Sequence, residues 1–102
     1  MQFVFHQDVL SSVVEEMSFL IKKNLEDKKQ EDWNILEIDL HAVRVMDSMG
    51  LNLLIGLLKH AQLRNARVRC KISSPTIHRT FLFTRLDKQM DVEFDRETSD
   101  IA

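Results

Sequence analysis

A polar pair interrupts an apolar stretch near the middle of the chain, and this interruption constrains the fold more than any other feature. The stretch runs from Val45 to Leu58, and the polar pair is Asp47-Ser48. After the pair, apolar residues recur with the spacing of an amphipathic helix, at Leu51, Leu54, Ile55 and Leu58. A serine or aspartate ahead of such a stripe is a typical N-cap, so either residue, or both together, is expected to begin the helix. The Ser48 hydroxyl is then expected near the positive end of that helix.

Two segments of alternating polarity flank this helix. In residues 35–40 the apolar positions alternate with Glu37 and Asp39, and in residues 67–72 they alternate with basic residues. Strand, helix and strand of these lengths form a βαβ unit, so the two strands are expected to be parallel neighbours joined by a right-handed crossover.

The remaining elements complete an alternating pattern. We expect strands near 3–5, 35–40, 67–72 and 91–94 and helices near 9–29, 48–64 and 75–84. Either Asp8 caps the first helix, or Ser12 and Glu15 form a capping box one turn later. Ser74 is expected to cap the third helix, with Pro75 at its first position.

The predicted fold class is α/β, with a mainly parallel four-stranded sheet and helices packed mostly on one face. The other face should be exposed and carry the charges of the two central strands, namely Glu37, Asp39, Arg67, Arg69 and Lys71. The predicted core contains Leu36, Ile38, Leu40, Leu54, Leu58, Val68, Cys70 and Phe81. Residues 1–102 are expected to form a single domain, in which residues 95–102 are a frayed tail.

Composition excludes several classes of function. The net charge of −2 provides no basic footprint for nucleic acid. The apolar runs are too short to span a bilayer, so no direct membrane insertion is expected. Cys70 is the one cysteine and cannot form an internal disulfide, and no signal peptide is visible, so the cytoplasm is the expected location.

The order Asp47-Ser48-x-Gly50-Leu51, after a 36–40 strand and before a leucine-rich helix, resembles the STAS domain of bacterial anti-sigma factor antagonists. The resemblance extends from about Phe3 to Phe94. It implies that an anti-sigma factor with serine kinase activity phosphorylates Ser48, and that a serine phosphatase reverses the modification. The unmodified domain would bind the anti-sigma factor and free the sigma factor.

The chain departs from this family in four places. The extra strand that usually comes first is not expected before residues 3–5, and its absence would leave one sheet edge less covered. The Gly-x-Leu-Asp turn before the first helix is reduced to Asp8, after His6. Met49 replaces a small residue, and Arg85 stands where a glycine often precedes a Leu-Asp pair.

Ligands and partners of parallel sheets favour the edge at the carboxyl ends of the strands. Besides the central pair, this edge should gather His6, His41 and Ser73-Ser74. The predicted partner-binding residues are Asp8, His41, Met46, Asp47, Ser48, Met49 and Gly50. The two methionines suit a docking surface but could equally be core residues, and both His6 and His41 could be plain turn residues.

An enzyme is not expected, and neither is a cofactor. A hydrolase elbow would need glycine where Met46 stands, and with only Gly50 and Gly56 the chain has no glycine-rich phosphate loop. His60 and His78 lack metal-ligand spacing. Two alternatives to partner switching stay open. One is a constitutive STAS scaffold in a lipid-transport ATPase complex or a stress-sensing assembly, and the other is a STAS module that binds a small ligand such as a nucleotide.

Overall fold

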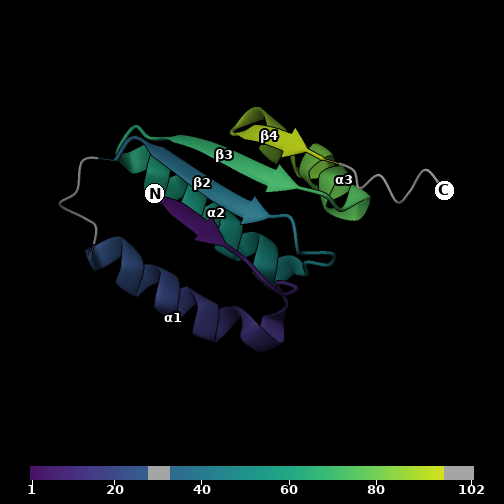
Figure 1. Ribbon diagram of the computed structural model, residues 1–102, viewed down its shortest axis with the longest axis horizontal. Helices are drawn as coiled ribbons and strands as arrows, with labels where there is room; N and C mark the ends of the chain where they lie inside the picture. Colours follow the sequence, from purple (N-terminus) through teal and green to yellow (C-terminus); the bar gives the residue numbers. More distant parts are fainter. Residues whose placement is uncertain (28–32, 96–102) are drawn as a thin grey trace.

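The computed structural model describes residues 1–27 and 33–95, and its elements alternate as the sequence predicts (Figure 1). They are β1 (Gln2–Val4), α1 (Ser11–Asp27), β2 (Ile35–Leu40), α2 (Ser48–Leu63), β3 (Arg67–Ile72), α3 (Pro75–Thr84), the 3-10 helix η1 (Leu86–Lys88) and β4 (Asp91–Phe94). The expected tail lies outside the described residues except for Asp95, as does the expected end of the first helix at 28–29.

The strands form one parallel sheet in the order β1-β2-β3-β4. The predicted pairing of the two central strands is confirmed, with Ile38 opposite Cys70. β1 is an edge strand, in agreement with the expectation of a less covered edge. The expected α/β class is thus confirmed, and helix α2 crosses behind the two central strands (Figure 1).

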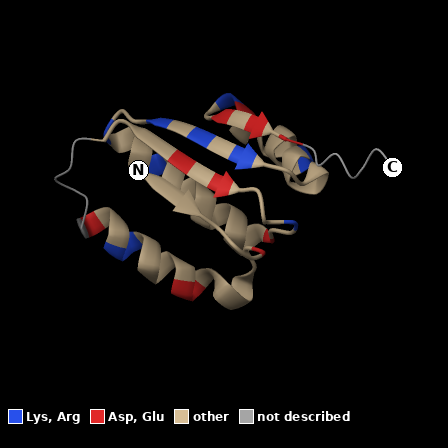
Figure 2. Cartoon of the chain, viewed as in Figure 1, with Lys and Arg blue, Asp and Glu red and all other residues tan. Residues whose placement is uncertain are grey.

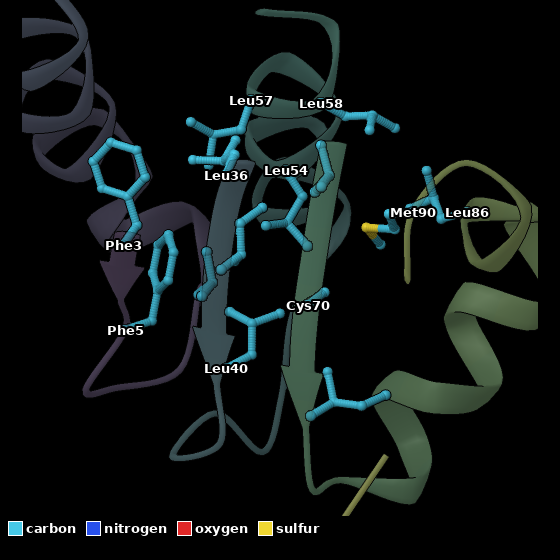
Figure 3. Close-up of a cluster of buried hydrophobic side chains, with 14 of the residues drawn as sticks. Phe3, Phe5, Leu36, Leu40, Leu54, Leu57, Leu58, Cys70, Leu86 and Met90 are labelled. Carbon is cyan, nitrogen blue, oxygen red and sulfur yellow. The ribbon is translucent and has the colours of Figure 1, made fainter. Parts of the chain in front are cut away.

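The core fills the space between the sheet and the helices (Figure 3). All eight predicted core residues are buried. Five of them are alternate positions of β2 and β3, and the other three lie on α2 and α3. On the same face of the sheet, Phe3 and Phe5 extend this cluster toward the β1 edge, and Leu86 and Met90 extend it toward the β4 edge (Figure 3). Burial, followed by the negative charge of Asp39, raises the pKa of the Cys70 thiol to about 12, so the thiol stays protonated.

The opposite face of the sheet carries alternating acidic and basic strands (Figure 2). Arg67 pairs with Asp91 at 3.1 Å, and Arg69 lies 3.8 Å from Glu37. As predicted, this face is not buried under helices: the three basic side chains of β3 are exposed, and Glu37 and Asp39 are half-buried. Each exposed pair contributes less than about 1 kcal/mol, so the charges favour solubility and register more than stability.

The start of α1 differs from the prediction. The helix begins at Ser11 and not at Val9, because Val9 forms a parallel bridge with Met46. The Val9 N–H donates to the Val45 carbonyl (3.2 Å), and its carbonyl accepts from the Asp47 N–H (3.3 Å). With these two bonds Val9 follows the loop before α2 and stays outside the helix. Both proposed caps are therefore wrong: Asp8 lies outside the helix, and Ser12 lies within it.

Candidate functional site

The carboxylate of Asp47 joins the starts of two helices. Its Oδ1 accepts a hydrogen bond from the Gly50 N–H (2.9 Å), and its Oδ2 accepts one from the Ser11 N–H (2.6 Å). Asp47 is thus the N-cap of α2 and also binds the first residue of α1. The bonds from Gly50 and then Ser11 hold the pKa of Asp47 below its usual value, since both favour the charged form.

Ser48 is the first residue of α2, and its side chain is exposed. The interpretation of Ser48 as an N-cap is wrong, because Asp47 takes that role. The hydroxyl is therefore presented to solvent at the amino end of a helix, where N–H groups and the helix dipole favour negative charge. A group attached to the Ser48 hydroxyl would leave the cap of α2 intact, because the Asp47 side chain provides that cap.

Gly50 allows the loop between β1 and α1 to lie directly against α2. A Cβ at this buried position would collide with the Val9 carbonyl oxygen and would lie 2.9 Å from Met46 Cγ. Its φ angle is not positive, so close approach is the reason for glycine here. The glycine of the motif thus permits the bridge between Val9 and Met46.

Buried serines and an aspartate fix the loop that leads into Asp47. Asp8 Oδ1 accepts hydrogen bonds from the N–H groups of Arg44 (2.8 Å) and Val45 (3.1 Å). On the other side, Ser73 Oγ donates to the His41 carbonyl (2.7 Å), and Ser74 Oγ donates to that of Arg44 (3.0 Å). The β1–α1, β2–α2 and β3–α3 connections therefore form one network that presents Ser48 on a fixed surface.

A comparison with known families agrees with this geometry. The family model of the STAS domain matches residues 7–100. The chain belongs to the STAS domain family. A search among curated proteins returned no significant match.

The other predicted site residues lie at this same edge of the STAS domain but in different environments. His41 is exposed, and its N–H donates to Asp39 Oδ1 (2.9 Å). Met46 is half-buried against the core, as its core interpretation predicts, whereas Met49 is 49% exposed. His6 is exposed and lines a groove between β1 and α1.

Val45 was not among the predicted site residues, and it is 50% exposed two residues before Asp47. Val45 and Met49 therefore put an exposed apolar residue on each side of the polar pair in the sequence. One signal was available: Val45 is apolar but lies five residues beyond the end of the alternating strand, so no strand requires it.

Two features are absent from the part of the chain that the structure describes. Among residues 1–27 and 33–95, no group of three or more His, Cys, Asp or Glu side chains could hold a metal ion. Within the same ranges, no helix is both long and apolar enough to cross a membrane. At the start of α2 the Ser48 hydroxyl is exposed together with the apolar side chain of Met49, a combination that suits recognition by another protein.

Proposed function

We propose that this STAS domain is an anti-sigma factor antagonist that works by partner switching under control of Ser48 phosphorylation. In its unmodified form it binds an anti-sigma factor with serine kinase activity. The kinase phosphorylates Ser48 with ATP, the complex dissociates, and a serine phosphatase restores the unmodified form. The chain itself catalyses nothing, uses no cofactor, contacts no nucleic acid and acts in the cytoplasm.

The observation that carries this proposal is the exposure of Ser48 at a helix start whose capping is done by its neighbour Asp47. Phosphorylation adds about −1.5 to −2 charges at neutral pH. The positive end of the α2 helix dipole favours that charge, so we expect the fold to survive. In a docked interface the same charge would lie desolvated beside the carboxylate of Asp47, which favours release.

The test uses purified wild type and two variants against each serine-kinase anti-sigma factor encoded by the host. Wild type should bind one of them and gain a single phosphate in the presence of Mg-ATP, as read by intact mass. Ser48→Ala should bind equally well but gain no phosphate. Its stability should be nearly unchanged, because Asp47 caps the helix. Ser12→Ala, which removes another exposed serine near a helix start, is the matched control and should behave as wild type.

Ser48→Asp examines the release step. A carboxylate is tolerated at a helix start, so circular dichroism should show an intact fold. Affinity for the anti-sigma factor should nevertheless fall ten-fold or more, which corresponds to about 1.4 kcal/mol or above. Equal affinities of wild type and Ser48→Asp in titration calorimetry would contradict the switch and favour the constitutive scaffold. Thermal stabilisation by a nucleotide, without kinase binding, would favour the ligand-binding module.

A further inference from the structure

A groove of about 350 Å³ runs between α1 and α2. Its walls are mainly apolar, with Val14 and Ile21 of α1 facing Leu53 and Leu57 of α2, and its polar lining residues are Ser18, Lys22, Asn52 and His60. Met49 lines the same groove and directly follows Ser48 in the sequence. The groove is therefore continuous with the surface that presents the phosphorylation site.

Gly56 lines this groove, and nothing in the described part of the domain requires a glycine at this position. It is exposed in the middle of α2, where glycine is less favourable than alanine. Its φ angle is not positive, so no special conformation requires it. A Cβ added at Gly56 would meet nothing within 4 Å, in contrast to Gly50. Neither the backbone nor the packing of residues 1–27 and 33–95 accounts for this glycine.

Because glycine has no side chain, another chain can approach the backbone closely at Gly56. The α2 residues that line the groove begin at Met49 and end at His60, eleven positions apart. At a helical rise of 1.5 Å per residue this is about 16 Å, or three turns. An apolar groove of this length fits the contact face of an amphipathic helix.

Charge gives the groove a preference for its occupant. Lys22 is the charged residue of its lining, and His60 lies in the last turn of α2. Among the described residues that line the groove, none is acidic, and helix α2 contains no Asp or Glu. An occupant with an acidic side chain beside its apolar face would therefore be complementary to this groove.

We propose that the groove between α1 and α2 receives an amphipathic helix of the anti-sigma factor, with a small side chain over Gly56 and an acidic side chain toward Lys22. The inference rests on the proposed function and extends the contact surface from Ser48 along α2. It assigns to Gly56 the role of a contact position rather than a structural one.

The test compares Gly56→Ala and Gly56→Met by titration calorimetry against each unphosphorylated serine-kinase anti-sigma factor of the host. Gly56→Ala should unfold at a higher temperature than wild type and yet bind several-fold more weakly. Gly56→Met should fill the groove and bind at least ten-fold more weakly. Gln62→Met is the matched control, since Gln62 is an exposed residue of α2 outside the groove, and it should bind as wild type.

A charge reversal provides the second arm. Lys22→Glu should weaken binding several-fold, whereas Lys23→Glu, exposed on α1 and outside the groove lining, should change it little. Circular dichroism of each variant checks that the fold is intact.

The outcomes separate the two proposals. Wild-type affinity of Gly56→Met would overturn the docking groove, even if Ser48→Asp still weakens binding and the switch therefore stands. A dimer of this domain in light scattering that Gly56→Met abolishes would identify a second copy as the occupant and would also overturn the assignment. If wild type binds none of the host kinases, both the switch and the groove are wrong.

Discussion

At the scale of single residues, the side chain of Asp47 connects the starts of two helices. It follows a loop, caps α2 through Gly50 and binds Ser11 at the start of α1. Each of its two oxygens thus accepts a backbone N–H from a different helix. The sequence narrowed the cap of α2 to Asp47, Ser48 or both, since that signal is local, and the structure assigns it to Asp47. The sequence could not predict the bond to Ser11, which lies 36 residues away.

Replacing Asp47 by asparagine should lower stability at neutral pH. The amide keeps one acceptor oxygen, while its NH₂ group would face a backbone N–H donor. The pKa of Asp47 is lowered in the folded state, so its contribution is present above the unfolded pKa near 3.8 and is lost as pH falls through the folded value. Urea unfolding should show a clear difference between wild type and Asp47→Asn near pH 7 that shrinks below about pH 4. A difference that is independent of pH would contradict this role.

The two glycines should respond in opposite directions to the same change. Gly50→Ala places a methyl group against the Val9 carbonyl and should destabilise the domain by about 1–3 kcal/mol. Gly56→Ala meets open space and should stabilise it by up to about 1 kcal/mol, because alanine is the better helix former. Chemical denaturation of both variants measures this, and each serves as the control of the other. Equal effects would mean that the close approach at Gly50 is not rigid.

At the scale of elements, periodicity was sufficient wherever side-chain patterns decide the structure. β2, β3, β4 and α3 have the predicted bounds, because strict alternation and the Ser74-Pro75 start are local signals. Helix α1 begins at Ser11, two residues after the expected start near residue 9, because the backbone of Val9 is bonded to a distant loop. The 3-10 helix η1 was not predicted, since three residues are too few to show a period.

The end of α3 offers a prediction at this scale. Arg85 ends the helix with φ of 60°, in the left-handed region that favours glycine. The sequence resemblance implies a glycine at this same position. Arg85→Gly should therefore stabilise the domain by up to about 1 kcal/mol, since relief of strain exceeds the entropic cost of glycine. Asn65→Gly, at a φ of 58°, is the control and should gain less, because asparagine tolerates this conformation. Thermal unfolding compares the two, and a loss of stability in Arg85→Gly would show that the arginine makes contacts that offset its strain.

At the scale of the whole molecule, the sequence predicted which loops meet but not how they are held together. Parallel strands bring their carboxyl ends to one edge, which placed Asp8, His41 and the Asp47-Ser48 pair side by side. The bonds from Ser73 and Ser74 into the preceding loop depend on exact register and orientation. The proposed occupant of the groove between α1 and α2 is a helix of another protein. This sequence therefore shows only the groove residues that would contact it.

The stability of the whole domain should depend on the layer where α2 meets the sheet. Leu54 is 3% exposed at the centre of this layer (Figure 3). Leu54→Ala should cost about 2–5 kcal/mol, a large share of the stability of so small a domain. Leu63→Ala makes the same chemical change at a side chain on α2 that is 87% exposed, and it should cost less than about 0.5 kcal/mol. Urea unfolding followed by circular dichroism and by Trp33 fluorescence should give coincident two-state transitions for both variants. A loss below about 1 kcal/mol for Leu54→Ala would mean that the contact between α2 and the sheet is not the main source of cooperativity.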